Sequence, residues 1–177
     1  MTAKNLTQQE SFDIKAKRIR MILSDVDGVL TDGTIAIDHQ GNESKRFSTA
    51  DGYGIRLWFQ AGYSFGLITG RRSECVLHRA KDLGINMVRL GTFAKREAVE
   101  EIANEQHLSL EQIAYIGDDL PDLPAIEAVG LGVTVPDAPE ELKNAADYIT
   151  KRCGGYGAVR DLINILLTLN NSVFVLK

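Results

Sequence analysis

Two aspartates separated by one residue stand directly behind a short apolar run. Asp25 and Asp27 follow Met21–Ser24, which we expect to be a β-strand, so their carboxylates leave the carboxyl end of that strand. Open α/β sheets bind ligands at this end, and a spacing of two puts both side chains on one side of an extended backbone. Because clustered carboxylates repel each other unless a cation neutralises them, the pair predicts a divalent metal, with Mg²⁺ the expected ion. An acidic turn is the alternative reading.

Polar groups also follow later apolar runs. A hydroxyl, accessible backbone N–H groups and a guanidinium come after residues 65–68, an arrangement suited to phosphate oxygens. These groups are Thr69, Gly70 and Arg71. Lys95 begins a predicted helix, where a cation opposes the helix dipole unless an anion is bound nearby. A second acidic cluster follows another apolar run and consists of Asp118, Asp119 and Asp122. Each group alone is more simply a turn or a surface charge, but four at successive strand and helix edges make coincidence improbable.

Short apolar runs that alternate with longer segments of helical period must position these groups. The expected strands are Met21–Ser24, residues 65–68, Met87–Leu90, residues 114–116 and residues 132–135. The expected helices cover residues 54–61, 73–83, 95–106, 123–129, 139–145 and 159–169. The pattern predicts an α/β fold with a doubly wound, Rossmann-like parallel sheet.

Residues 34–47 break this alternation. They alternate polar and apolar side chains around a turn-like centre, so we expect a β-hairpin inserted after the first strand, too small to be a cap domain. A hairpin of this size is marginal alone in water and needs another surface, either its own sheet or a neighbouring subunit, which points to an oligomer. Residues 1–18 are expected to form an N-terminal arm, loose or helical, ahead of one domain over residues 19–177.

The composition restricts the classes of function. The chain of 177 residues is 44% hydrophobic and 25% charged, as globular domains are, and its formal net charge of −4 makes nucleic acid a poor partner. No N-terminal apolar core precedes a cleavage site, and no run of roughly 18 apolar residues occurs, so we expect neither a classical export signal nor a membrane span. Two widely separated cysteines form neither a disulfide framework nor a thiolate metal site, which favours the cytoplasm.

The motifs together resemble those of the haloacid dehalogenase superfamily. They are Asp25-x-Asp27-Gly-x-x-Thr31-Asp32-Gly33, Ile68-Thr69-Gly70-Arg71, Lys95 and Gly117-Asp118-Asp119-x-x-Asp122. Over residues 20–167 the chain more closely resembles the small capless phosphatases that act on 3-deoxy-D-manno-octulosonate (KDO) 8-phosphate in lipopolysaccharide synthesis. Two further segments carry this closer resemblance, residues 47–56 after the hairpin and residues 154–160 before the last helix.

The resemblance implies a role for each motif residue. Asp25 would be the nucleophile that forms an aspartyl-phosphate, and Asp27 would protonate the leaving alcohol and then deprotonate water. Asp25, Asp118 and the backbone carbonyl of Asp27 would bind Mg²⁺, with Asp119 or Asp122 orienting metal-bound water. Phosphoryl oxygens would be held by Thr69 and Lys95.

The resemblance also implies contacts with a sugar-acid substrate. Guanidinium groups suit its carboxylate, and the matching positions are Ser48, Thr49, Ala50, Asp51, Gly52, Arg56, Gly70, Arg71 and Arg79. Members of the family form homotetramers in which hairpins assemble and a neighbour's C-terminal segment closes the site. The hairpin and residues 154–157 are the expected pieces here, although Tyr156 stands where many relatives have a basic residue.

Three other functions are compatible with parts of the pattern. The first is a phosphatase for a nine-carbon ulosonate 9-phosphate or for small phosphate esters in general; by resemblance to the family, Arg71 favours the eight-carbon acid. The second is a receiver-like signalling domain, but a receiver places its acidic pair before the phosphorylated aspartate, whereas here Asp25-x-Asp27 comes first. The third is an inert scaffold, although every catalytic side chain is present.

Overall fold

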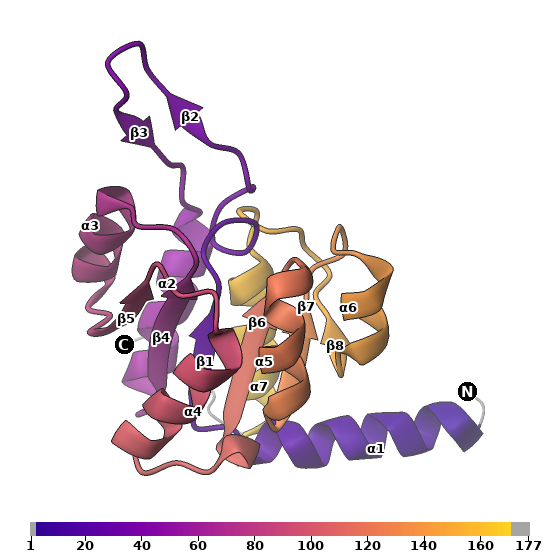
Figure 1. Ribbon diagram of the computed structural model, residues 1–177. Helices are drawn as coiled ribbons and strands as arrows, with labels where there is room; N and C mark the ends of the chain where they lie inside the picture. The colour runs from indigo at the N-terminus through magenta and orange to yellow at the C-terminus, as the bar shows by residue number, and fades with distance from the viewer. Residues whose placement is uncertain (1–2, 171–177) are drawn as a thin grey trace.

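Six parallel strands form one central sheet in the computed structural model, which describes residues 3–170. The strand order is β5-β4-β1-β6-β7-β8 (Figure 1). The strands are β1 (Met21–Ser24), β4 (Ser64–Thr69), β5 (Met87–Leu90), β6 (Ile113–Gly117), β7 (Leu131–Thr134) and β8 (Tyr148–Ile149). The predicted α/β class is therefore confirmed, and β8 is an additional edge strand that the sequence did not predict.

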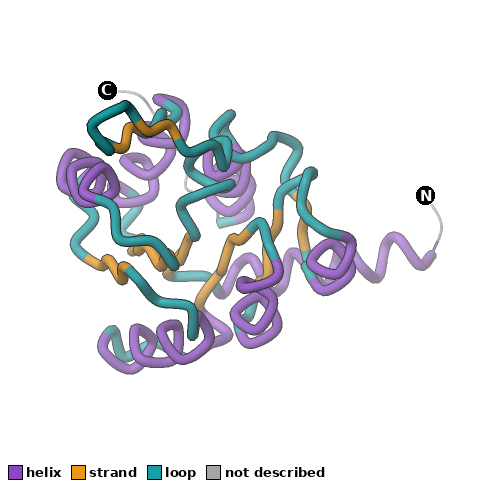
Figure 2. The backbone as a smooth tube through the Cα atoms, turned by 45° about the horizontal axis from the view of Figure 1, so that its top comes forward, coloured by secondary structure: helices purple, strands orange, loops and turns teal. Residues whose placement is uncertain are grey.

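Helices cover both faces of the sheet (Figure 2). They are α1 (Ala3–Arg18), α2 (Thr49–Gln60), α3 (Glu74–Leu83), α4 (Lys95–Glu105), α5 (Leu123–Ala128), α6 (Glu140–Ala145) and α7 (Ala158–Leu169), with short 3₁₀ turns η1 (Leu110–Gln112) and η2 (Leu120–Asp122). Helices α2 and α7 pack against each other on one face, and α4 packs against α5 on the other. None of the helices in residues 3–170 is both long and apolar enough to cross a membrane.

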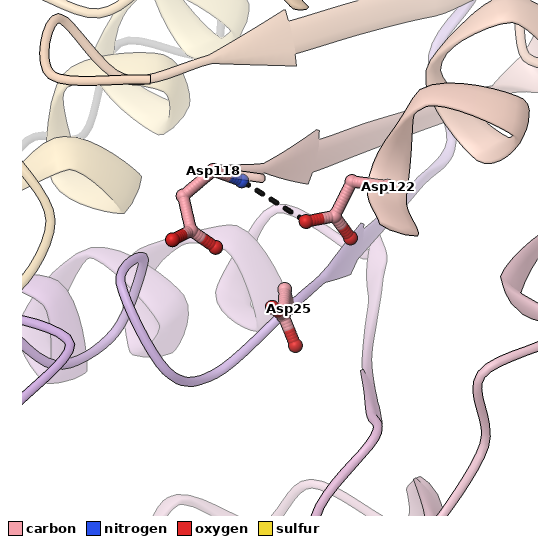
Figure 3. A group of neighbouring side chains, drawn as sticks. All are labelled: Asp25, Asp118 and Asp122. Atoms are coloured by element: carbon pink, nitrogen blue, oxygen red, sulfur yellow. Dashed lines mark hydrogen bonds between the residues drawn. The ribbon is translucent and has the colours of Figure 1, made fainter. Parts of the chain in front are cut away.

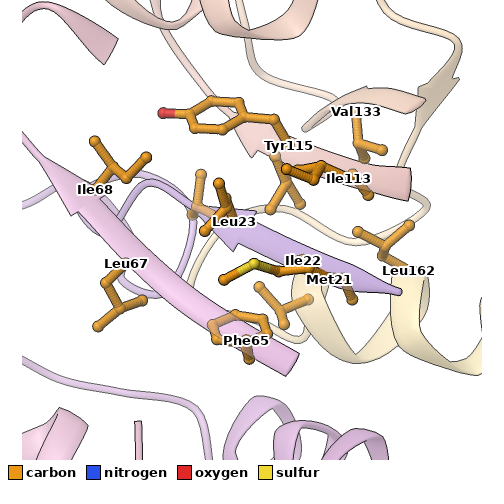
Figure 4. Close-up of a cluster of buried hydrophobic side chains, with 14 of the residues drawn as sticks. Met21, Ile22, Leu23, Phe65, Leu67, Ile68, Ile113, Tyr115, Val133 and Leu162 are labelled. Carbon is orange, nitrogen blue, oxygen red and sulfur yellow. The ribbon is translucent and has the colours of Figure 1, made fainter. Parts of the chain in front are cut away.

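Strand β1 lies at the centre of the core. All four of its residues are buried, because it pairs with β4 on one side and β6 on the other while helices cover both faces. Its apolar side chains pack among those of neighbouring strands (Figure 4). Burying a side chain of this kind contributes about 1.5–3 kcal/mol, so the end of β1 is a firmly held position for reactive groups.

The predicted hairpin position contains two short antiparallel strands, β2 (Ala36–Ile37) and β3 (Glu43–Ser44). The turn between them is closed by Asp38, whose carboxylate accepts hydrogen bonds from the N–H groups of Gln40 and Asn42. The hairpin projects away from the domain at the top of Figure 1, and the side chain of Ile37 is 63% exposed. An exposed isoleucine on a protruding hairpin leaves apolar surface that the described part of this chain does not cover.

Candidate active site

The loop after β1 continues the sheet pairing and then turns sharply. Asp25 donates its backbone N–H to Ile116 of β6 at 2.9 Å, so it is held as tightly as a strand residue. The Thr31 hydroxyl closes the loop by accepting hydrogen bonds from the N–H groups of Gly28 and Gly33, each at 3.3 Å. Gly28 has a φ of +93°, and a Cβ there would lie 1.9 Å from Asp118 Oδ2. Only glycine therefore lets this loop approach the second acidic cluster.

Three carboxylates meet where β1 and β6 end. Oxygens of Asp25, Asp118 and Asp122 all lie within 4.8 Å of one another (Figure 3). Asp25 and Asp118 each keep one buried oxygen, Oδ1, without a hydrogen-bond partner among the residues that the structure describes. Buried polar atoms without partners are rare, so these two oxygens mark a place where a cation would complete the structure. The structure thus brings together the first and last acidic motifs, as the sequence predicts.

Asp122 differs from the other two carboxylates because both of its oxygens already have donors. Its Oδ1 accepts hydrogen bonds from Lys95 Nζ at 2.5 Å and from the Tyr115 hydroxyl at 2.6 Å. Its Oδ2 accepts the backbone N–H groups of Asp118 and Asp119 at 3.1 and 3.2 Å. Asp122 therefore holds the lysine and the acidic loop in place. Tyr115, which the sequence analysis did not single out, is part of this arrangement.

Without a bound metal ion, the negative charges of the three carboxylates are not fully neutralised. Burial, with the neighbouring charge of Asp122, raises the pKa of Asp25 to about 6 despite the opposing charge of Lys95. Burial and the charge of Asp25 raise the pKa of Asp118 to about 8. A divalent cation bound to both would favour their ionised forms. The unpartnered carboxylate oxygens are the hard ligands that Mg²⁺ prefers, so these residues fit this ion.

Lys95 lies inside the cluster. Its ammonium is 3.0 Å from Asp25 Oδ2, and the residue is only 4% exposed. Burial lowers the pKa of Lys95, but attraction to Asp25 and Asp122 outweighs that effect, so the net change is upward. The lysine is therefore a fixed positive charge next to Asp25. Thr69, at the end of β4, is buried, and its hydroxyl accepts the N–H of Arg71 at 3.2 Å.

A second group of charges lies where the hairpin meets the domain. Asp27 Oδ1 accepts a hydrogen bond from Lys45, whose ammonium also pairs with Glu43 Oε1 at 3.2 Å. Arg71 pairs with the same Glu43 oxygen at 3.1 Å, and Ser73 donates to Glu43 Oε2 at 2.5 Å. The sequence analysis missed Glu43 and Lys45. Their spacing of two, which puts both side chains on one face of a strand, was the available signal.

The predicted substrate contacts on α2 and α3 lie elsewhere. Arg56 and Arg79 line a groove of about 510 Å³ between these helices, together with Thr49 and Gly52, and none of Asp25, Asp27 or Asp118 lines it. Arg79 donates to the backbone carbonyl of Ser48, the N-cap of α2. Ala50 lines a separate small cavity beside α7.

Asp51 contacts the start of α7. The residue is 1% exposed, and its Oδ1 accepts the N–H of Arg160 in the first turn of α7 at 2.7 Å. Burial raises the pKa of Asp51, although the backbone N–H groups of Arg160 and Gly157 oppose the rise. The observed contact joins α2 to α7, while Oδ2 of Asp51 is buried and has no hydrogen-bond partner among the described residues.

The glycine-rich segment at residues 154–157 packs against the loop after β1. A Cβ at Gly154 would lie 1.7 Å from the carbonyl oxygen of Gly28, and Gly155 donates its N–H to Val29 at 2.9 Å. The glycines therefore permit close backbone contact within one chain. Tyr156 between them is 64% exposed.

The chain is similar to proteins of known family. The model for haloacid dehalogenase-like hydrolases matches residues 91–155, which include Lys95 and Asp118. The 3-deoxy-D-manno-octulosonate 8-phosphate phosphatase KdsC of Escherichia coli K12 is 42% identical over 153 residues, covering 86% of this chain and 81% of its own.

Solved structures agree with these matches. A putative haloacid dehalogenase hydrolase (subfamily III A) of Legionella pneumophila superimposes with a TM-score of 0.94 at 41% identity, covering 97% of this chain and 94% of its own. A 3-deoxy-D-manno-octulosonate 8-phosphate phosphatase of Moraxella catarrhalis, solved with magnesium, phosphate and KDO, gives a TM-score of 0.90 at 40% identity, with 93% and 94% covered.

Proposed function

Because this chain belongs to the 3-deoxy-D-manno-octulosonate 8-phosphate phosphatases of the haloacid dehalogenase superfamily, we propose that Asp25 carries the phosphoryl group during catalysis. The protein is a Mg²⁺-dependent phosphatase that hydrolyses KDO 8-phosphate to KDO and phosphate in lipopolysaccharide precursor synthesis. The observation that carries the proposal is the pair of buried, unpartnered oxygens on Asp25 and Asp118, placed beside the ammonium of Lys95.

The residues then act in a two-step displacement. Asp25 attacks phosphorus, the P–O bond to the sugar breaks, and the leaving oxygen takes a proton from Asp27. Asp27 next removes a proton from water, which attacks the aspartyl-phosphate and regenerates Asp25. Lys95 and Thr69 are positioned to stabilise charge on the phosphoryl oxygens.

Mg²⁺ would be held by the carboxylates of Asp25 and Asp118 and by the backbone carbonyl of Asp27. When bound, it neutralises negative charge on the phosphoryl group and its nucleophile. Asp122 supports the site by holding Lys95, since its own oxygens already accept four hydrogen bonds. Asp119, which accepts the N–H of Leu120 as the N-cap of η2, stays outside the ligand set.

The carboxylate of the sugar acid is assigned to Arg71, whose partly exposed guanidinium lies 3.8 Å from Asp27 Oδ2. Within one chain, Asp51 is left out because it is bound to α7. Arg56 and Arg79 line the separate groove between α2 and α3. We therefore propose that they contact substrate bound to a neighbouring subunit and not substrate bound to their own chain. The same applies to Thr49 and Gly52.

We also propose a homotetramer in which hairpins assemble and a neighbouring subunit completes the site. Ile35 and Ile37 support this proposal because they expose apolar surface on a hairpin that is too small to be stable alone. Both cysteines, Cys75 and Cys153, are unpaired, which is consistent with a cytoplasmic enzyme.

The decisive assay is phosphate release from KDO 8-phosphate with Mg²⁺ and with a chelator. We expect turnover with Mg²⁺ only, and we expect Asp25→Asn to fold but to release no phosphate. Near-native activity of that variant would remove Asp25 from the nucleophile's role. If a nine-carbon acid phosphate or a plain sugar phosphate is turned over about tenfold better, the substrate assignment is wrong. A long-lived aspartyl-phosphate without turnover would instead support a signalling domain.

A further inference from the structure

Lys45 is a buried cation that no step of the proposed reaction uses. Its side chain is 0% exposed although it belongs to a hairpin that projects from the domain. A lysine loses much hydration free energy on burial unless its ammonium is paired and hydrogen-bonded. Here the ammonium meets two carboxylates, Asp27 and Glu43, so its position has a specific electrostatic cause.

The two oxygens of Asp27 have different surroundings. Oδ1 accepts the hydrogen bond from Lys45, whereas Oδ2 is buried, has no hydrogen-bond partner within residues 3–170 and lies 3.8 Å from Arg71 Nε. The side chain of Arg71 is 44% exposed and can re-pair with an incoming anion, while Lys45 is enclosed. One oxygen is thus held by the protein, and the other is left for the reacting group.

Glu43 fixes Lys45 in turn. Its Oε1 pairs with both Lys45 and Arg71, and its Oε2 accepts a short hydrogen bond from Ser73, the residue before α3. The carbonyl of Glu43 also accepts the thiol of Cys75 at 3.3 Å. The base of the hairpin is therefore attached to the domain at several points, and Lys45 is not a freely rotating surface lysine.

We propose that Lys45 is a positioning residue, which reaches from the hairpin to hold Asp27 Oδ1 so that Oδ2 faces the leaving oxygen of the substrate. The proposal rests on the acid/base role of Asp27 given above. It makes the hairpin part of the catalytic apparatus of its own chain. Small displacements of a catalytic group cost up to about 100-fold in rate, so the loss of this contact should reduce turnover strongly.

The test compares three variants with the native enzyme. Lys45→Met removes the ammonium at similar length, Lys45→Arg restores a cation, and Arg46→Met is the matched control. Arg46 is the next residue on the same hairpin and also pairs with an aspartate, Asp32, but its side chain is 84% exposed. Steady-state kcat and KM for KDO 8-phosphate are measured with the Mg²⁺ activation constant, after circular dichroism has verified folding.

Positioning predicts that Lys45→Met lowers kcat by about 100-fold while KM and the Mg²⁺ constant change less than about threefold. Lys45→Arg should recover part of kcat, and Arg46→Met should behave as the native enzyme. A raised KM with unchanged kcat would overturn the proposal, because Lys45 would then bind substrate. Kinetics equal to those of Arg46→Met would overturn it as well. If Lys45→Met does not fold, Lys45→Gln replaces it, since glutamine keeps a donor without the charge.

A crystal structure of the variant separates this proposal from the function on which it rests. The Asp27 carboxylate should rotate away from its native orientation in Lys45→Met and keep it in Arg46→Met. An unchanged Asp27 would refute positioning even if the native enzyme is active. If the native enzyme releases no phosphate, the proposed function is refuted. The orientation of Asp27 in the crystal structures would still decide whether Lys45 positions it.

Discussion

Replacing Asp118 by asparagine removes a carboxylate that lies in a buried cluster with Asp25. Because the pKa of Asp118 is raised to about 8 in the folded protein, the unfolded chain loses this proton at lower pH than the native state does. The stability of the metal-free protein should therefore fall as pH rises from about 4 to about 8. Asp118→Asn lacks the titrating carboxyl, so its stability should fall less over this pH range.

The magnitude follows from the separation of the two charges. Oxygens of Asp25 and Asp118 lie within 4.8 Å of one another, and two unit charges at that limit repel by about 3 kcal/mol at an effective dielectric constant of about 20. For a chain of this length, 1 kcal/mol corresponds to about 2–4 °C in melting temperature. We therefore expect metal-free Asp118→Asn to melt about 6–12 °C above the native protein at pH 9, with a much smaller difference at pH 5.

Mg²⁺ should reverse the order of stability. At 1,000 times its dissociation constant, the ion stabilises the native protein by about 4.1 kcal/mol, which exceeds the repulsion of about 3 kcal/mol, and the variant should gain little of this. The assay is thermal unfolding followed by circular dichroism between pH 5 and pH 9, in chelator and in Mg²⁺. Asp119→Asn serves as control, because it removes a neighbouring charge while asparagine can still accept the N–H of Leu120. Equal pH slopes for Asp118→Asn and the native protein, or equal stabilisation by Mg²⁺, would refute the reasoning.

Two further substitutions test the surroundings of the acidic cluster. Tyr115→Phe removes one hydrogen-bond donor from Asp122, the carboxylate that holds Lys95, so kcat should fall about tenfold. The control is Tyr148→Phe, which also loses a hydroxyl bonded to an aspartate and should leave kcat unchanged. Equal kcat values for the two variants would contradict the role of Tyr115. Gly33→Ala should lose about 1 kcal/mol of stability because Gly33 has a positive φ, and Gly28→Ala should lose more because its Cβ would also overlap Asp118. Of the two, only Gly28→Ala should also lose the stabilisation by Mg²⁺ in thermal scans, because its Cβ would overlap an oxygen of Asp118. If Gly28→Ala keeps that stabilisation, the placement of the ion is contradicted.

Much of the architecture follows from local pattern. Met21–Ser24 forms a strand with the expected bounds because continuous apolar residues suit a strand that is buried on both faces. Carboxyl ends of adjacent parallel strands meet at one sheet edge, so Asp25 and Asp118 could be placed together from sequence alone. The helix that begins at Lys95 likewise brings its first residue to that edge.

Other features depend on partners that no local pattern identifies. Lys45 pairs with a residue 18 positions earlier, and alternation along the hairpin indicates a shared face without indicating what that face meets. Asp51 is a polar residue at a helix start, where it could equally contact a ligand or the rest of the protein. Its actual partner is 109 positions away. Strand β8 has two residues, too few for any period to be visible.

The contact between the loop after β1 and Gly154 affects how the protein is made. A ribosome produces the loop early and the glycines that lie against it much later, so the nascent chain carries a nucleophile whose surroundings are incomplete. Chains stalled before residue 154 should be more readily degraded by proteases around Gly28 than finished ones.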